Sequence, residues 1–234
     1  MLSGNGCRLS AVPSVPGRGG APWICCGKVP LITFEGVEGC GKSTQLRLAG
    51  RRIRDGGLSV IETREPGGTR IGEQIREILM DAAHTHLDPV SEWLLYEADR
   101  RQHVREVLAP GVAAGAFVLC DRYADATEAY QQEGRGVDRA GVALVDGIAR
   151  DGLMPDLTLL YDLEPEEGLA RAYRRDGRAG RFEAADIGFH RRVREAYLAI
   201  ARREPDRVVV VPAGGSVEDV AALTWVPIAE RFLG

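Results

Sequence analysis

The residues GVEGCGKS, at positions 36–43, have the G-x-x-x-x-G-K-S spacing of a phosphate-binding loop. The apolar run LITF at 31–34 precedes them, and the helix-like run TQLRLA at 44–49 follows. Glycines let successive backbone N–H groups point into one concavity, and the start of a helix adds its positive end. The stretch therefore predicts a strand, a glycine loop and a helix that together bind the phosphates of a nucleotide, rather than a chance glycine-rich turn.

Two side chains of this loop are candidates for the chemistry. We expect Lys42 to reach the β- and γ-phosphates and the Ser43 hydroxyl to bind Mg²⁺. The chain has 30 Lys and Arg residues, but only Lys28 and Lys42 are lysines, so this position keeps the compact charge that phosphate binding uses. The expected ATP-binding residues of this region are Gly36, Val37, Glu38, Gly39, Cys40, Gly41, Lys42, Ser43 and Thr44. The helix start should also make the Cys40 thiol reactive, with ATP protecting it.

Length and composition predict one α/β domain with ordinary globular character. The chain has 234 residues and a net charge of −4, which indicates no general affinity for nucleic acids. No apolar run approaches the ~20 residues of a membrane span, so we expect no membrane partner. The five cysteines show no zinc or C-x-x-C spacing. Their odd number, together with a nucleotide loop, favours a reducing cytoplasm.

Residues 1–28 differ from the rest of the chain. They contain six Gly, three Pro and no acidic residue, and they lack the continuous apolar stretch of a secretory signal. We expect this extension to be disordered and residues 29–234 to form the domain. The alternative is that translation starts at Val29, which mass spectrometry of the native N-terminus would decide.

Strand-like and helix-like runs alternate along the domain. Apolar strands are expected at 31–35, 58–63, 116–120, 157–163 and 208–211. Helices are expected at 42–54, 71–79, 89–108, 165–175, 186–203 and 217–232, and in two pieces within 124–152. This alternation predicts a three-layer fold: a five-stranded parallel sheet with helices on both faces. Ligands of such sheets gather at the carboxyl ends of the strands, where Asp121 and Arg122 follow a buried strand.

A glycine loop alone does not separate kinases, GTPases and ATPase motors. With no lysine after Lys42, the chain lacks the N-K-x-D guanine motif. Five stretches, covering about residues 30–232, resemble bacterial thymidylate kinases, which are P-loop nucleoside monophosphate kinases. The stretches are FEGVEGCGKSTQ (34–45), TREPGGT (63–69), LLYEADR (94–100), DRYADATEAYQ (121–131) with GRG (134–136), and PDLT (155–158). The resemblance implies Mg²⁺-dependent transfer of the γ-phosphoryl group of ATP to dTMP in dTTP biosynthesis. It also implies a homodimer and a mobile, arginine-rich lid at 174–183.

The same resemblance implies roles for individual residues. Glu38 would accept a hydrogen bond from the sugar 3′-hydroxyl, Tyr96 would stack on thymine, and Arg122 would hold the acceptor phosphate. The implied dTMP-binding residues are Glu38, Arg64, Pro66, Tyr96, Arg100, Arg122, Thr127, Tyr130 and Gln131. Catalysis is assigned to Lys42, Arg122, Arg178 and Arg181, metal binding to Ser43, Asp121 and Glu183, and contact with adenine to Pro212 and Ala213. Position 126 departs from the family pattern, since Ala126 stands where Ser is usual.

Several alternatives stay open at this point. Tyr96 and Tyr130 could be core residues, Asp121 a strand-end cap, and Arg64 half of a local ion pair. The lid arginines could form a solvated turn. The four histidines show no metal-ligand spacing and are expected to be structural or exposed. A kinase for another small acceptor and a non-catalytic nucleotide-binding module are the rival functions.

Overall fold

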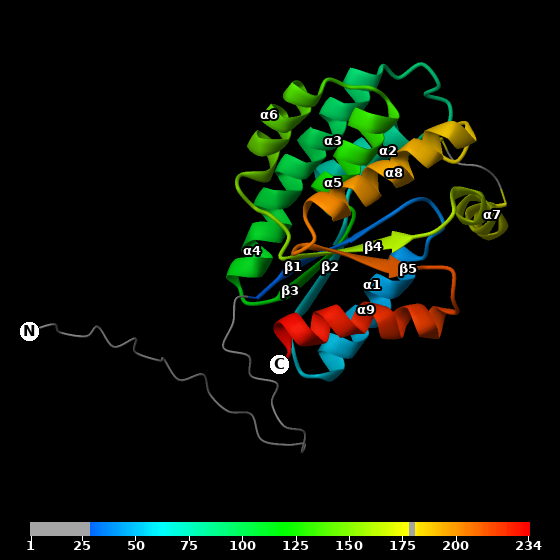
Figure 1. Cartoon of the computed structure of the whole chain (residues 1–234). Helices are drawn as coiled ribbons and strands as arrows, with labels where there is room; N and C mark the ends of the chain where they lie inside the picture. The colour runs from blue at the N-terminus through cyan, green and yellow to red at the C-terminus, as the bar shows by residue number, and fades with distance from the viewer. Residues whose placement is uncertain (1–28, 178–180) are drawn as a thin grey trace, which may run out of the picture.

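A single parallel sheet organises the molecule. The computed structural model describes residues 29–177 and 181–234 (Figure 1). Within that part, the strands β1 (Leu31–Glu35), β2 (Val60–Arg64), β3 (Phe117–Asp121), β4 (Leu157–Asp162) and β5 (Val208–Pro212) form one sheet in the order β2-β3-β1-β4-β5. All neighbouring pairs are parallel. The predicted five-stranded parallel sheet is confirmed, and the strand bounds differ from the expected ones by at most two residues.

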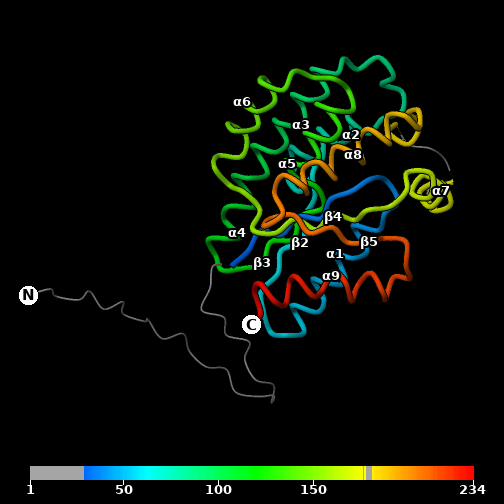
Figure 2. Tube along the Cα trace, viewed as in Figure 1, coloured from blue at the N-terminus to red at the C-terminus, as the bar shows by residue number. Residues whose placement is uncertain are grey.

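Helices cover both faces of the sheet. The helices α1 (Lys42–Asp55) and α9 (Val217–Phe232) lie against one face, and α4 (Ala109–Ala113) and α8 (Ile187–Arg203) lie against the other (Figure 1). Figure 2 shows α9 beside α1, although the two helices come from opposite ends of the described chain. Because helices shield both faces, the central strand β1 is buried along its whole length.

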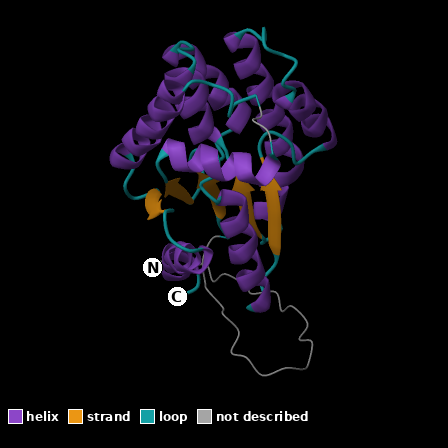
Figure 3. Cartoon of the chain, turned by 90° about the vertical axis from the view of Figure 1, so that its right-hand side faces the viewer, coloured by secondary structure: helices purple, strands orange, loops and turns teal. Residues whose placement is uncertain are grey.

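A further group of helices stands above α8. The helix α3 (Pro89–His103) packs on both α2 (Arg70–Met80) and α6 (Arg139–Arg150), and α7 (Pro165–Asp176) lies beyond the carboxyl ends of the strands (Figure 1). The turned view of Figure 3 shows the strands between the two groups of helices. None of the helices in the described part of the chain has the length and apolar character needed to cross a bilayer.

Two helical runs contain wider turns that the sequence does not reveal. The run expected at 89–108 consists of α3 and a π-helical turn, η1 (Val104–Leu108), and it continues directly into α4. The first part of the run expected at 124–152 is α5 (Ala124–Thr127) and a second π-helical turn, η2 (Glu128–Gly134). Such turns are frequent at functional sites. Here η2 carries Tyr130 and Gln131, two of the residues implied for the acceptor.

Part of the sequence prediction falls outside the described residues. The extension 1–28 and the lid residues Arg178, Ala179 and Gly180 belong to this part. The expected disorder of the extension, and the expected role of Arg178, therefore stay predictions.

Candidate active site

The glycine loop joins β1 to α1 and leaves the start of α1 open. Gly36, Gly39 and Gly41 have φ values of +137°, +69° and +95°, which L side chains rarely adopt. A Cβ atom at Gly39 would lie 1.9 Å from the carbonyl oxygen of Gly168, so space also excludes a side chain there. No side chain caps α1, whereas Thr69 and Ser216 cap the starts of α2 and α9. The first N–H groups of α1 are thus available to an anion.

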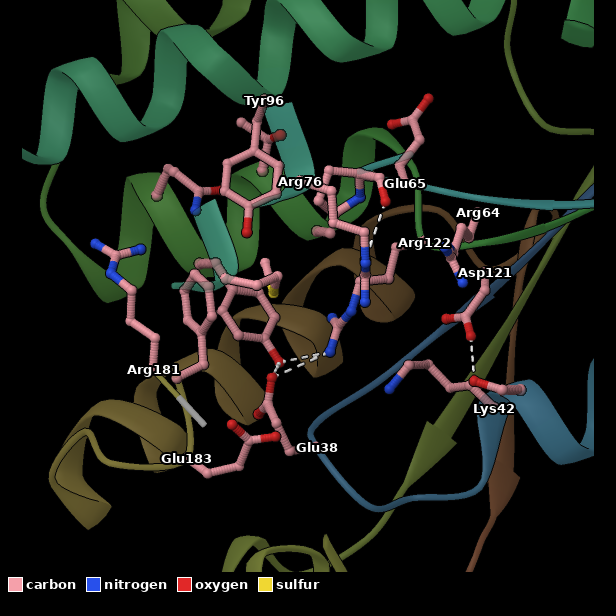
Figure 4. Close-up of a pocket in the computed structure, with 18 of the residues that line it drawn as sticks. Glu38, Lys42, Arg64, Glu65, Arg76, Tyr96, Asp121, Arg122, Arg181 and Glu183 are labelled. Carbon is pink, nitrogen blue, oxygen red and sulfur yellow. Dashed lines mark hydrogen bonds and ion pairs between the residues drawn. The ribbon is translucent and has the colours of Figure 1, made fainter. Parts of the chain in front are cut away.

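The predicted phosphate-binding side chains lie at this helix start. The ammonium group of Lys42 donates to the carbonyl oxygens of Gly36 (3.1 Å) and Val37 (2.8 Å). The hydroxyl of Ser43 donates to the Oδ2 atom of Asp121, the last residue of β3 (Figure 4). Asp121 therefore orients the hydroxyl, a role that the strand-end alternative did not include.

These two residues also suit a nucleotide-bound metal. Mg²⁺ in kinases is held by one or two protein oxygens together with phosphate oxygens and water. Among the described residues, no group of three or more His, Cys, Asp and Glu side chains could hold a metal by itself. Ser43 and Asp121 meet the need for one or two oxygen ligands. Glu183 lies on the side of Glu38 in Figure 4, away from this pair, so the structure does not bring the three predicted metal ligands together.

A pocket of about 410 Å³ opens beside the glycine loop (Figure 4). It lies at the carboxyl edge of the sheet, where the sequence placed the ligands. Many of the predicted site residues line it: Glu38, Gly39, Lys42, Ser43, Arg64, Pro66, Tyr96, Arg100, Asp121, Arg122, Thr127, Tyr130, Gln131, Arg181 and Glu183. One cavity thus holds the phosphate-binding lysine and the residues implied for the acceptor.

Arg122 occupies the centre of this pocket in an unusual backbone conformation. Its φ value is +72°, in the left-handed region that costs a non-glycine residue roughly 1–2 kcal/mol. Its Nη2 atom donates to the Oε1 atom of Glu38 (3.1 Å) and to the hydroxyl of Tyr130 (3.0 Å). Its Nη1 atom donates to the hydroxyl of Tyr197 (3.1 Å). The guanidinium group is therefore held from three sides, unlike that of an ordinary surface arginine.

Glu38 is a charged hydrogen-bond acceptor inside the loop. Burial by itself would raise its pKa, but His190, Arg122 and Lys42 together lower the pKa of Glu38 to about 2. The hydroxyl of Tyr130 donates to Oε1 at 2.6 Å. The Oε2 atom is buried and faces Nδ1 of His190 at 3.4 Å. Glu38 thus places a negative charge beside Arg122 in the wall of the pocket.

The far end of the pocket is formed by α2 and α3. Tyr96 is half-buried, lines the cavity and also packs on the core, while its stacking on thymine stays a prediction. Arg76 lines the cavity as well and donates to the carbonyl oxygen of Pro66 at 3.0 Å. Burial and the neighbouring charge of Arg64 lower the pKa of Arg76. Arg64 itself pairs with Glu73 at 2.9 Å, which is the local ion pair left open above.

Arg100, one of the implied dTMP-binding residues, is engaged by protein groups. Its side chain is buried and donates to Glu65 (3.0 Å), Glu97 (2.8 Å) and Thr127 (3.0 Å). Further bonds reach Asp146 and a backbone carbonyl. Since each nitrogen of the guanidinium already has a protein acceptor, Arg100 supports the wall of the pocket and orients Thr127.

The lid arginine Arg181 is turned away from the phosphate site. Its Nη2 atom donates to Oε2 of Glu92 at 2.6 Å, and its Nη1 atom donates to the carbonyl oxygen of Leu79 at 3.2 Å. Glu92 is buried and also accepts from the amide of Gln131 at 3.0 Å. Figure 4 shows Arg181 on the side of Tyr96, opposite Lys42. In this structure Arg181 therefore belongs to the acceptor end of the pocket.

Some predicted residues do not line this pocket. Val37 and Cys40 are buried beneath the glycine loop, and the Cys40 side chain is only 2% exposed, which contradicts the expected reactive thiol. Gly36, Gly41 and Thr44 belong to the loop and the helix start without facing the cavity. Pro212 and Ala213 lie at the end of β5, where Arg171 donates to the carbonyl oxygen of Ala213 at 3.1 Å.

Several residues near the site were missed by the sequence reasoning. Within the cavity wall these are Glu65, Arg76, Met80 and Ala126, whereas Arg175 and Phe182, which also line it, belong to the expected lid. Behind the wall, His190 and Tyr197 contact Glu38 and Arg122, and the buried His190 has a structural role, one of the two expected of the histidines. They lie on one side of α8, seven residues apart, and this helical spacing is the signal that could have paired them.

Comparisons with known proteins agree on one family. A family model described as thymidylate kinase matches residues 34–223. The chain is 50% identical over 197 residues to a thymidylate kinase of Trichlorobacter lovleyi, covering 82% of this chain and 93% of the relative. It is 48% identical over 207 residues to that of Geotalea uraniireducens, covering 86% and 97%. Among solved structures, the thymidylate kinase from Ehrlichia chaffeensis aligns with a TM-score of 0.70 and 30% identity, over 88% of this chain and all of that chain.

Proposed function

The chain belongs to the thymidylate kinase family, and we propose that it transfers the γ-phosphoryl group of ATP to dTMP in the pocket of Figure 4, forming dTDP and ADP. One observation carries this proposal: Lys42 and Arg122, the two cations suited to two different phosphate groups, line the same cavity. The family is one of ATP-dependent nucleoside monophosphate kinases. Phosphoryl transfer needs two nucleotides in line, with fixed cations to neutralise the charge that gathers between them.

The donor end is assigned to the glycine loop. The open N-terminus of α1 and Lys42 would bind the phosphates of ATP. Ser43 and Asp121 would hold Mg²⁺, which when bound neutralises charge on the β- and γ-phosphate oxygens. Adenine would lie near Pro212 and Ala213, as the family resemblance implies. Glu183 stays a metal-ligand candidate on the resemblance alone.

The acceptor end is assigned to the opposite half of the pocket. Arg122 would hold the phosphate of dTMP, Tyr96 would lie against the base, and Glu38 would accept the sugar 3′-hydroxyl, as the family resemblance implies. A phosphate oxygen is already a competent nucleophile. The reaction therefore needs no general base, and positioning with charge neutralisation supplies the catalysis.

We also propose a homodimer in the cytoplasm, without a nucleic-acid or membrane partner. Large apolar side chains are exposed on the outer helices, among them Leu94 of α3, with Leu144 (67% exposed) and Ile148 (63%) of α6. α3 and α6 pack side by side, so these residues offer apolar area to a second copy. Light scattering of the purified protein should give twice the mass of the chain, and the Leu144→Glu variant should give the mass of a single chain.

A coupled assay of ADP release tests the activity. The purified chain is given ATP, Mg²⁺ and, in turn, dTMP, dUMP, UMP, dCMP and AMP. We expect rapid ADP release with dTMP. Faster turnover of another monophosphate would support a kinase of different acceptor specificity. Binding of nucleotide with no ADP release would support a non-catalytic module.

A further inference from the structure

Glu35 is a buried carboxyl group that the reaction as described does not use. It is the last residue of β1, it is 0% exposed, and it does not line the pocket. Buried carboxyl groups are rare unless they have hydrogen-bond partners. The backbone N–H of Tyr123 donates to its Oε1 atom at 2.6 Å, and the hydroxyl of Tyr197 donates to its Oε2 atom at 2.7 Å. Both partners adjoin Arg122.

The first contact holds the backbone of Arg122. The N–H of Arg122 donates to the carbonyl oxygen of Phe34 at 3.1 Å, and the next N–H, that of Tyr123, donates to Glu35. The end of β1 thus binds the amides on both sides of the Arg122 α-carbon. These two bonds oppose the relaxation of Arg122 out of its left-handed conformation.

The second contact reaches the guanidinium group. Tyr197 projects from α8, and its oxygen accepts from Nη1 of Arg122 at 3.1 Å while its hydrogen is given to Glu35. The ring of Tyr197 is braced edge-on against that of Tyr130, with 6.2 Å between ring centroids. One carboxyl group therefore supports Arg122 at its backbone and, through one tyrosine, at its charged end.

We propose that Glu35, acting through Tyr197 and the Tyr123 amide, is a positioning residue that aims Arg122 at the acceptor phosphate. This inference rests on the proposed function, in which Arg122 binds the phosphate of dTMP. A free arginine side chain loses rotational freedom when it binds a phosphate, and a guanidinium group already held in place loses less. The support should therefore strengthen binding of the phosphate group without changing contacts to the base or sugar.

The charge of the site agrees with this arrangement. Burial, together with the charge of Asp125, raises the pKa of Glu35 to about 8, against the opposing effects of Arg122, Tyr197 and Tyr123. A neutral carboxyl group would donate to the Tyr197 oxygen instead of accepting from it, so the contact with Tyr197 is available in both protonation states. A glutamine can accept from the Tyr123 amide and hydrogen-bond Tyr197, so Glu35→Gln is the conservative variant.

The test compares two ligands that differ by one phosphate group. Calorimetry gives the Kd of dTMP and of thymidine for the wild type, Tyr197→Phe, Glu35→Gln and Tyr161→Phe. Tyr161→Phe is the matched control, because it removes a hydroxyl that is equally buried but bonds Thr224 instead. We expect Tyr197→Phe to raise the Kd of dTMP about tenfold, as for a lost bond to a charged group, and to change that of thymidine less than twofold. Glu35→Gln and Tyr161→Phe should stay within about threefold of wild type for both ligands.

A second measurement asks whether the effect passes through Arg122. In an Arg122→Ala background, Tyr197→Phe should change the Kd of dTMP less than twofold. The positioning role is overturned if Tyr197→Phe weakens both ligands equally, if it weakens neither, or if its effect persists without Arg122. A wild type that binds thymidine and dTMP with equal affinity, or phosphorylates no dTMP, instead overturns the proposed function itself.

Discussion

The two ends of the pocket are built in different ways. The donor end is a continuous stretch, residues 36–43, whose ligands are backbone N–H groups, one lysine and one hydroxyl. The acceptor end is assembled from side chains of separate elements: Tyr96 from α3, Arg122 after β3 and Tyr130 from η2, with Tyr197 of α8 behind the wall. A continuous site depends on local conformation, whereas an assembled site depends on every contact that holds its parts in register. The two ends should therefore respond differently to substitution.

The largest effect is expected at Lys42. Lys42→Met removes the charged contact to the transferring group at the donor end, and kcat should fall by about 10³-fold. Because the glycine loop is held by backbone geometry, the circular dichroism spectrum and the midpoint of unfolding should stay close to wild type. Arg51→Met, an exposed cation on the same helix, is the control and should keep normal turnover. Normal kcat in Lys42→Met would disprove the donor assignment.

At Arg181 we expect a loss of stability, which is smaller in free energy than the loss of turnover at Lys42. Arg181→Ala leaves Glu92 buried without its closest cationic partner, and breaking such a pair costs about 3 kcal/mol of unfolding free energy. Urea denaturation measures this loss. Arg139→Ala breaks the exposed pair with Glu133 and should cost less than about 0.5 kcal/mol.

Kinetics of the same Arg181 variant separate the two interpretations of this residue. If stability stays unchanged and kcat falls by about 10³-fold, Arg181 acts on the phosphates and the acceptor-end placement does not describe the working enzyme. If stability falls as expected, the catalytic arginine is to be sought at Arg178, where the same kcat loss is predicted from the sequence.

The sequence predicts the donor end better than the acceptor end for the same physical reason. The glycine loop, the parallel sheet and the residues at the end of β3 follow from local patterns and from the alternation of strands and helices. The acceptor residues came from resemblance, and the contacts among them could not be read. The left-handed conformation of Arg122 has no local signal, because a distant strand stabilises it.

The side-chain contacts behind the acceptor end could not be predicted from the sequence either. The pairing of Arg181 with Glu92, and that of Glu35 with Tyr197, joins residues 89 and 162 positions apart. Tyr130 lies in the π-helical turn η2, and no glycine or proline at position 130 indicates such a turn in the sequence. Long-range side-chain pairs of this kind are decided by packing, and packing is not a property of any one segment.

Discrimination between sugars should be sensitive to one ring at the acceptor end. Tyr130 is 5% exposed and lies in the pocket wall, so a ribose 2′-hydroxyl placed against it would be buried without a partner. That costs ~1–3 kcal/mol, or roughly 10- to 150-fold in kcat/KM. Tyr130→Ala should reduce the ratio of the kcat/KM for dTMP to the kcat/KM for its ribose analogue.

The ratio is a sound measure even for a destabilised variant. The ring of Tyr130 also packs against Phe182 and Phe189, so Tyr130→Ala should lose stability. Both substrates are assayed with the same folded fraction of the enzyme, so that fraction cancels in the ratio of their kcat/KM values. Tyr130→Phe keeps the ring and should keep the ratio. A ratio unchanged in Tyr130→Ala would leave packing as the whole role of this residue.

The smallest effect is expected at Cys40, inside the donor loop. If backbone conformation builds this end, a side chain that faces away from the cavity should be replaceable, whatever its chemistry. Cys40 is buried and free, and its Sγ atom lies 3.6 Å from Nζ of Lys42. Cys40→Ala removes that weak contact while the glycines on both sides keep the curvature of the loop. We therefore expect kcat and the KM for ATP to change less than twofold. Iodoacetamide should label the wild-type thiol slowly in the native protein, and equally slowly with and without ATP, since burial limits access in both states. Rapid labelling that ATP prevents would mean that the loop opens to expose Cys40, and the donor end would then be no more rigid than the acceptor end.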